Sequence, residues 1–291
     1  MKIAACVLAI LTASFSESAA EKLTVSSFST VLTEIAGRVG GNRVEVRAHV
    51  KPGIDPHDFE PKPADLQLAS SSDIILLSAK HMEGYVNKLE EALGTKARIV
   101  QVGDRFPSLK MAVEEGGGTV EDPHWWHSIA NAQRATKVVR DEFIKLRPAD
   151  EAAFSQNAEA YLAKLGALQK WAKAKVAELP RNQRKLVTSH DAFQYFAREH
   201  GFTVLTVEGV STADQPSSRK VADLIRRIKK EGVKAIFAEN IENPKVLKEI
   251  TKETGAKLGG ELYADGLGEG PAATYEGMIR HNVSTIVDAL K

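Results

Sequence analysis

The stretch ADEAAFSQNAEAYLAKLGALQKWAKAKVAEL (residues 149–179) decides the architecture of this 291-residue chain. It contains no proline and a single glycine, Gly166, and it lies between Pro148 and Pro180. Its apolar residues recur at helical spacing, at Phe154, Ala158, Tyr161, Leu162, Leu165 and Leu168. A helix of about 30 residues is roughly 45 Å long, enough to cross a domain. Because a flexible tether would be rich in Gly and Ser instead, the stretch predicts a stiff connecting helix.

Short β-rich runs alternate with helical patterns on both sides of this stretch. The predicted strands are Leu23–Phe28, Val44–Val50, Asp73–Ser78, Arg98–Val102, Lys185–Ser189, Thr203–Val207, Lys234–Ala238 and Lys257–Leu262. The predicted helices are Val31–Val39, Ala64–Ser70, Gly84–Leu93, Ala192–His200, Ser218–Lys230, Lys245–Thr254 and Ala273–Leu290. Strands that alternate with helices form βαβ units and mostly parallel sheets. The predicted fold class is therefore α/β, with two parallel-sheet lobes joined by one long rigid helix. The glycine-rich segment Glu114–Asp122 is predicted as a mobile surface loop.

The charge balance of the chain excludes some classes of partner. There are 39 Lys and Arg residues against 38 Asp and Glu residues, a formal net charge of +1. A protein that binds nucleic acid through phosphates needs a basic excess, so a nucleic-acid partner is not expected. No apolar run reaches the length of about 18 residues that a transmembrane helix requires.

The N-terminus has the composition of an export signal. Lys2 precedes the apolar run Ile3–Leu11, and Ser18-Ala19-Ala20 offers the small residues of a cleavage site. A buried first strand or helix is the alternative interpretation. The predicted division is a signal peptide at 1–20, an N-terminal lobe at 21–148, the linking helix at 149–180 and a C-terminal lobe at 181–291.

The single cysteine, Cys6, lies inside the predicted signal. The mature chain would then contain no cysteine, which excludes disulfides, cysteine-based zinc sites and thiol catalysis. Cys6 precedes most of the apolar run, which is too early for the cysteine of a lipoprotein. We therefore expect a periplasmic protein without a lipid anchor, and we expect it to be a monomer.

Four polar residues fall where predicted strands end. His57 follows the second strand, His124 lies beyond the fourth, His190 ends the first strand of the second half, and Asp265 follows the last. In open parallel sheets, ligands bind beyond the carboxyl ends of the strands. Because each half of the chain supplies two of these residues, they can converge only in a cleft between the lobes.

Three imidazoles and one carboxylate can form a four-ligand metal site. Imidazole nitrogen suits Zn²⁺, and one hard oxygen also tolerates Mn²⁺. A lone histidine near a strand end is commonly an ordinary polar residue, but four residues at analogous positions are harder to explain in that way. Spacing alone leaves both interpretations open.

The local sequences around these residues resemble a known family. They are PHDFEP (56–61), DPHWW (122–126), TSHDAFQYF (188–196) and YADGL (263–267), and GVKAIFAE (232–239) matches as well. In this order they resemble the zinc- and manganese-binding solute receptors of bacterial ABC importers, the cluster A-I group of ZnuA-like and TroA-like proteins. The resemblance covers nearly all of the predicted mature chain. It implies that His57, His124, His190 and Asp265 are metal ligands, and that the fold is two four-stranded parallel lobes joined by one long helix.

The chain departs from the family pattern in two places. Many zinc-specific relatives carry a histidine-rich loop before the second ligand, whereas residues 110–122 contain no histidine. His127 occupies a position after the second motif where it serves either as a spare ligand or as a packing residue at a helix start. Manganese-specific relatives often use Glu in place of the third histidine, so His190 favours Zn²⁺, with Mn²⁺ as the alternative.

The resemblance implies a receptor that captures the ion and delivers it to a membrane permease, without catalysis. A zinc-dependent hydrolase is the alternative from another class, because three histidines could also hold a reactive water. No His-Glu-x-x-His sequence and no paired carboxylates accompany the motifs, which disfavours an enzyme. A surface adhesin is a third possibility, disfavoured here by the position of Cys6.

Acidic residues that flank the candidate ligands could orient the imidazoles. These candidates are Asp58, Glu60, Asp122 and Asp191.

Overall fold

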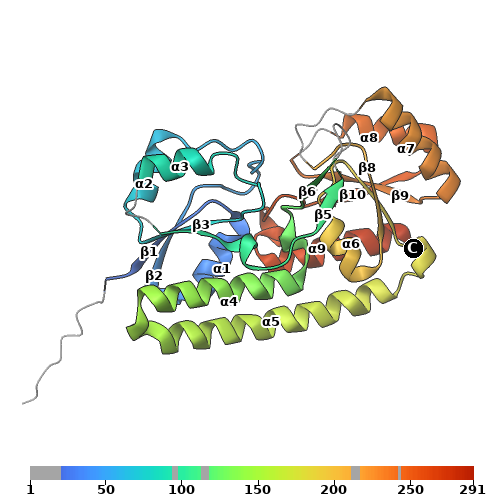
Figure 1. The fold of residues 1–291 in the computed structure, drawn as a ribbon. Coiled ribbons are helices and arrows are strands. Elements are labelled where there is room, and N and C mark those ends of the chain that lie inside the picture. Colours follow the sequence, from blue (N-terminus) through green and yellow to red (C-terminus); the bar gives the residue numbers. More distant parts are fainter. Residues whose placement is uncertain (1–20, 94–97, 113–117, 211–216, 242–243) are drawn as a thin grey trace, which may run out of the picture.

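The computed structural model describes residues 21–93, 98–112, 118–210, 217–241 and 244–291. Two α/β lobes lie side by side on a long helix that runs beneath both (Figure 1). The predicted α/β fold class with two parallel-sheet lobes is confirmed. The predicted signal peptide lies outside the described residues and stays a prediction, as do the domain limits at 148 and 180.

The N-terminal lobe is built on one parallel sheet with the strand order β2-β1-β3-β4. Its strands are β1 (Leu23–Ser27), β2 (Val44–Ala48), β3 (Ile74–Leu77) and β4 (Arg98–Gln101). Its helices are α1 (Thr30–Gly40), α2 (Pro63–Ser70) and α3 (Val86–Leu93). Alternate residues of β3 point to opposite faces: Ile74 packs in the core shared with α1, and Ile75 packs in the core shared with α2 and α3. Because helices cover both faces, β3 is continuously apolar.

The C-terminal lobe repeats this arrangement. β7 (Lys185–Thr188) pairs in parallel with β8 (Thr203–Thr206), and β9 (Ala235–Glu239) pairs in parallel with β10 (Lys257–Leu262). These pairs are two separate hydrogen-bonded sheets, but β7 lies beside β9, so the strands lie in the spatial order β8-β7-β9-β10, which corresponds to the order of the N-terminal sheet. The helices of this lobe are α6 (Gln194–His200), α7 (Ser218–Glu231), α8 (Lys245–Thr254) and α9 (Tyr275–Leu290).

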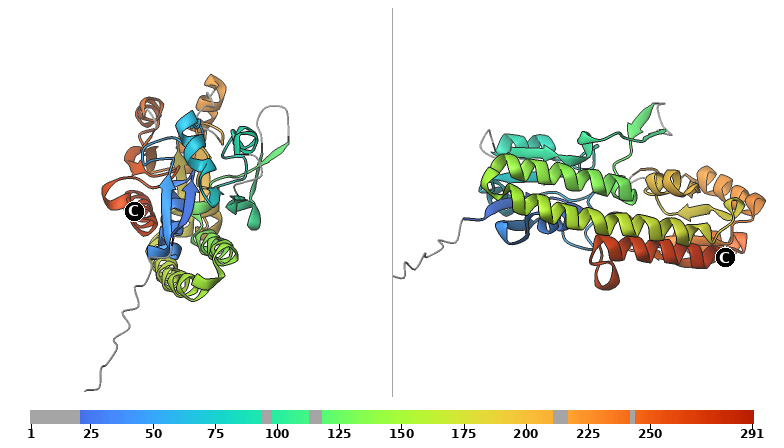
Figure 2. Two further views of the ribbon diagram at one scale, coloured as in Figure 1. Left: turned by 90° about the vertical axis from the view of Figure 1, so that its left-hand side faces the viewer. Right: turned by 90° about the horizontal axis from the view of Figure 1, so that it is seen from below.

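The connecting helix α5 (Glu151–Ala177) ties the lobes together. Its 27 residues span about 40 Å. It packs on α1 and on α4 (Ile129–Leu146) in the N-terminal half and on α9 in the C-terminal half. The view from below in Figure 2 shows α5 between α4, in green, and α9, in red. Its buried side chains are Phe154, Ala158, Tyr161, Leu165, Leu168, Ala172 and Val176. They belong to one hydrophobic core that continues from one lobe into the other, so the lobes share packed side chains as well as a covalent link.

The segment predicted as a surface loop is partly a strand. β6 (Thr119–Glu121) pairs antiparallel with β5 (Lys110–Ala112), while residues 113–117 lie outside the described residues. A strand of three residues is too short to show a two-residue periodicity, so the glycines around it dominated the prediction. Among the described residues, no helix combines the length and apolarity that a membrane crossing requires.

Candidate metal centre

The first two site histidines, His57 and His124, each lie in the same local sequence, Asp-Pro-His. Asp55 Oδ1 accepts the backbone N–H of His57 at 2.8 Å, and Asp122 Oδ1 accepts that of His124 at 2.9 Å. An Asp side chain that bonds to the backbone two residues later makes a tight turn, and the proline fixes the backbone angle between them. His57 is thereby held in the loop after β2, and His124 just after β6.

His190 and Asp265 come from the C-terminal lobe. His190 follows β7, and Glu239 at the end of β9 holds it: Oε1 accepts the N–H groups of Ser189 and His190 at 3.0 and 3.1 Å. Asp265 lies three residues after the end of β10. Each lobe therefore supplies two residues. His57, His190 and Asp265 follow strands of the parallel sheets, as expected, whereas His124 follows β6 of the antiparallel β5–β6 pair.

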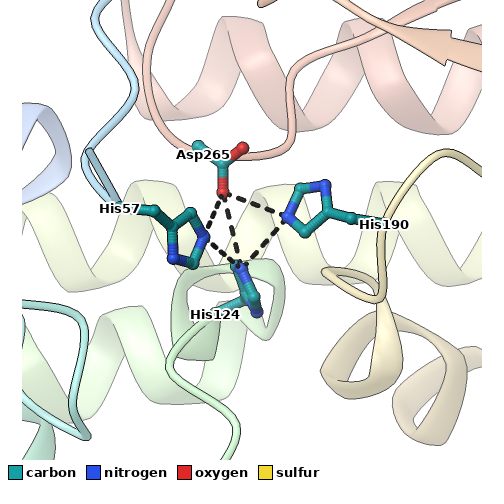
Figure 3. Close-up of side chains that lie close together, drawn as sticks. All are labelled: His57, His124, His190 and Asp265. Carbon is teal, nitrogen blue, oxygen red and sulfur yellow. Dashed lines mark hydrogen bonds and ion pairs between the residues drawn. The ribbon is translucent and has the colours of Figure 1, made fainter. Parts of the chain in front are cut away.

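These four side chains converge on a common point where the lobes meet (Figure 3). Nε2 of His124 lies 3.2 Å from Nε2 of His57 and 3.3 Å from Nε2 of His190. Oδ1 of Asp265 lies 3.3, 3.5 and 3.4 Å from the Nε2 atoms of His57, His124 and His190. Four ligands at the usual zinc distances of about 2.0–2.1 Å stand about 3.3–3.4 Å apart in a tetrahedron. The five measured separations match the edges of such a tetrahedron.

The site is almost completely shielded from water. The side chains of His124 and His190 are 0% exposed, that of Asp265 is 2% exposed and that of His57 is 9% exposed. Both carboxylate oxygens of Asp265 are buried without a hydrogen-bond partner. A buried carboxylate without hydrogen bonds is costly unless a cation compensates it. The donor set and the orphaned carboxylate therefore fit a divalent metal ion.

Two further carboxylates orient the imidazoles from behind. Nδ1–H of His124 donates to Asp122 Oδ1 at 2.9 Å, and Nδ1–H of His190 donates to Glu239 Oε2 at 2.5 Å. With the proton held on Nδ1, the lone pair of a neutral imidazole lies on Nε2, which faces the common point. Asp122 was among the predicted orienting residues. Glu239 was missed, although an acid at the end of a buried strand is a recognisable pattern.

The electrostatics of the site are dominated by burial and by these carboxylates. Burial lowers the pKa of His190, but the charges of Glu239 and Asp265 outweigh it and raise the pKa well above its usual value. Burial likewise acts against the charged form of His124, but the hydrogen bond to Asp122 and the close contact with the Asp265 carboxylate raise its pKa overall. Burial raises the pKa of Asp265, yet the charge of His190 and the close contacts with the three imidazoles hold it well below its usual range. Protons are therefore the natural competitors of a metal ion here.

The remaining residues highlighted by the sequence lie outside the group of four. His127 is buried, and its Nε2–H donates to the backbone carbonyl of Ala264 at 2.7 Å rather than facing the common point. Burial and the neighbouring His124 lower the pKa of His127 to about 3. Glu60 pairs with Lys88 at the surface, and Asp191 accepts a hydrogen bond from Gln194. Neither of these two acids orients an imidazole through a contact of this kind.

The chain as a whole is similar to known metal-binding proteins. The family model described as "Zinc-uptake complex component A periplasmic" (ZnuA) matches residues 25–289. The manganese-binding lipoprotein MntA of Bacillus subtilis is 34% identical over 96% of this chain and 94% of its own length. The zinc-binding protein TroA of Treponema pallidum is 31% identical over 99% of this chain and 98% of its own. A solved structure of periplasmic zinc-binding TroA superposes with a TM-score of 0.86 and 29% identity, over 93% of this chain and 99% of that one.

The prediction that the protein carries no lipid anchor is wrong. Several relatives, from Bacillus and from Streptococcus, are named lipoproteins. The prediction rested on the few apolar residues before Cys6, and the length of an apolar run measures hydrophobicity without testing whether a cysteine is acylated. The argument against a surface adhesin used the same reasoning about Cys6 and therefore no longer holds. A location outside the cytoplasm is supported by the family description, which calls its members periplasmic.

Proposed function

This chain belongs to the ZnuA family of metal-binding receptors of ABC importers, and we propose that it captures Zn²⁺ and delivers it to a membrane permease. The observation that carries the proposal is the buried group of four: three imidazole Nε2 atoms and one carboxylate oxygen at tetrahedral separations. A receptor must bind and enclose the ion that it carries. A group of ligands from both lobes can surround an ion on all sides. The permease partner follows from the family, whereas a monomeric state stays a prediction.

In this proposal His57, His124 and His190 bind the ion through Nε2, and Asp265 binds it through Oδ1. The carboxylates of Asp122 and Glu239 increase the basicity of two of these imidazoles and hold their rings in place. Asp265 supplies the negative charge that partly neutralises the ion. Neither of its carboxylate oxygens has a hydrogen-bond partner in the protein, and the ion would supply a partner.

The ligand set favours Zn²⁺ over Mn²⁺. Mn²⁺ suits oxygen-rich, six-coordinate sites, and affinity for a nitrogen-rich site is higher for Zn²⁺. Within the described residues, the group that could hold an ion contains three nitrogens and one carboxylate, and no second acid. Mn²⁺ is the second candidate, because relatives of similar identity are named manganese-binding and zinc-binding.

The same geometry supports a carrier rather than a hydrolase. A catalytic zinc ion usually has three protein ligands and an open position for water. Here protein atoms occupy all four corners of the tetrahedron, and none of the four side chains is more than 9% exposed. An ion held in this way has no exposed position at which water could be activated, so we propose that the chain binds without catalysis.

Metal analysis of chelator-treated protein titrated with Zn²⁺ is expected to give one tightly bound ion per chain. Anomalous scattering at the zinc edge should place that ion between the four side chains, about 2.0–2.1 Å from each imidazole nitrogen. Competition between Zn²⁺ and Mn²⁺ should leave Zn²⁺ bound. A tight site elsewhere, with the group of four empty at saturating Zn²⁺, would contradict the proposal, and displacement by equimolar Mn²⁺ would change the proposed cargo.

Metal is expected to raise the melting temperature without a large rotation of the lobes. An ion that binds only the folded state stabilises it by about 2.7 kcal/mol at a free concentration of 100 Kd. The shared core along α5 resists hinge motion, because rotation would break packing on both sides of the helix. Calorimetry should show the rise, while small-angle scattering should show the same radius of gyration with and without Zn²⁺. A marked compaction would contradict the stiff-helix interpretation.

A further inference from the structure

The backbone carbonyl of Ala264, which precedes Asp265, accepts two hydrogen bonds from the segment that follows His124. Trp126 Nε1–H donates to it at 2.8 Å and His127 Nε2–H at 2.7 Å. We propose that His127 is a positioning residue for the metal site, which together with Trp126 fixes this carbonyl and so places the Asp265 carboxylate. The inference rests on the proposed function, since it concerns a ligand of the same site.

The surroundings of His127 suit a neutral hydrogen-bond donor of fixed orientation. The side chain is 2% exposed, and its ring packs on Phe193 at 4.3 Å between ring centres. Phe193 comes from the C-terminal half, just before α6. A neutral imidazole has a single N–H, and here that proton lies on Nε2, because a carbonyl oxygen can only accept. His127 therefore has one well-defined bond to make, and it makes that bond to the peptide beside Asp265.

Asp265 depends on its backbone for its position. Neither of its carboxylate oxygens has a hydrogen bond, and Oδ1 contacts only the three imidazoles with which it would share the ion, so no described side chain outside the group of four is seen to hold the carboxylate in place. On the far side of Asp265, Leu267 N–H donates to Thr30 Oγ1 of α1 at 2.8 Å. Gly266 between them has φ +147°, and a Cβ there would come within 2.4 Å of Thr30 Oγ1. Residues before and after Asp265 are thus held by groups of the N-terminal half.

This arrangement gives the site an unexpected division. By sequence Asp265 belongs to the C-terminal lobe, but its loop is fastened to the structure that carries His57 and His124. The two donors on Ala264 therefore set the distance between Asp265 and the ligands from the N-terminal half. Without the His127 donor, the Ala264 carbonyl keeps only the hydrogen bond from Trp126. The loop is then freer to move, and metal binding must restrict that motion.

The test measures Zn²⁺ affinity and dissociation rate, by chelator competition, for His127→Leu and His127→Gln. Outer-sphere partners of metal ligands typically contribute 10- to 100-fold in affinity. We expect His127→Leu to bind about ten-fold more weakly, with faster dissociation, because removing such a partner loosens a ligand. His127→Gln keeps an N–H donor at a similar reach and should recover most of the loss. The matched control is His49→Leu, which replaces a buried histidine that bonds to Ser26 and Asp65 and is not one of the group of four; it should keep the wild-type affinity.

The decisive comparison repeats His127→Leu in an Asp265→Ala background. A residue that acts through Asp265 has nothing left to position there, so the second substitution should change affinity no further. An equal loss in both backgrounds, an unchanged affinity of His127→Leu, or no recovery with Gln would each overturn the inference. If the His127→Leu chain does not fold, Trp126→Phe removes the other donor to the same carbonyl and is measured in the same two backgrounds. Failure of the proposed function is seen separately, as an Asp265→Ala variant that binds Zn²⁺ like the wild type.

Discussion

Replacing His124 by Ala is expected to lower the affinity for Zn²⁺ by more than about 100-fold, beyond the range seen when only outer-sphere partners of a metal are removed. His124 has measured separations to all three of the other proposed ligands, at 3.2, 3.3 and 3.5 Å. Its loss removes one metal bond and also takes the imidazole partner from Asp122, which is 0% exposed and would keep only the backbone N–H of residue 124. Removing one partner of a buried carboxylate is itself destabilising.

The matched controls are His281→Ala and His127→Leu. His281 makes its hydrogen bond to the Glu261 carbonyl, outside the group of four, so its removal should leave the affinity within about two-fold, as for surface substitutions in general. The His127 variant should fall between the two. Chelator competition on all three proteins measures the order directly. A loss in His127→Leu equal to that in His124→Ala would mean that the second ligand is misassigned.

Affinity for Zn²⁺ is expected to fall by about 100-fold or more between pH 7 and pH 5. Histidine ligands must be neutral to bind a metal, and each proton that must leave costs up to about tenfold in affinity per pH unit. The pKa values of His124 and His190 are raised, so protonation of these rings already competes near neutral pH. The pKa of Asp265 is held well below its usual range, so this ligand stays ionised throughout that interval.

The same shifts determine how stability depends on pH. A raised histidine pKa stabilises the metal-free fold fully below about pH 6.5, the unfolded value, and this contribution is lost as pH rises through the folded pKa. The depressed pKa of Asp265 stabilises the folded state at pH values above about 3.9, the unfolded pKa. This stabilisation is lost as the pH falls through the pKa of the folded state. The metal-free protein thus gains from its own ion pairs under mildly acidic conditions. The increase in melting temperature on adding Zn²⁺ should therefore be larger at pH 7.5 than at pH 5.5.

Isothermal titration in buffers of different ionisation enthalpy counts the released protons. Near pH 6 we expect at least one proton per Zn²⁺ bound, because His190 is charged beside Glu239 and Asp265 in the metal-free state. A count of zero, with the ion bound between the four side chains, would contradict the three-histidine site.

The sequence by itself determined the order of the strands in the two lobes and the four candidate ligands, whereas the helix α4 and the strands β5 and β6 were not among the predicted elements. The connecting helix was predicted over 149–179 and runs from Glu151 to Ala177, because apolar spacing and flanking prolines are local signals. The last strand was predicted at Lys257–Leu262 and is found there. His57, His190 and Asp265 follow strands of the parallel sheets, whose carboxyl ends gather at one edge of each sheet, whereas His124 follows β6 of the antiparallel β5–β6 pair. The rule that ligands bind beyond the carboxyl ends of parallel strands therefore predicted, from residue order alone, that these side chains meet in space.

Only the tertiary structure decided how the four side chains are held. The bond between His190 and Glu239 joins residues 49 positions apart, and that between Trp126 and Ala264 joins residues 138 apart. No periodicity or turn pattern records such pairs, because they depend on how the two lobes dock along α5. For the same reason the sequence left His127 between a spare ligand and a packing residue, whereas the folded chain turns its Nε2–H toward Ala264. Local patterns encode elements, and hydrogen bonds between distant segments exist only once the shared core has brought those segments together.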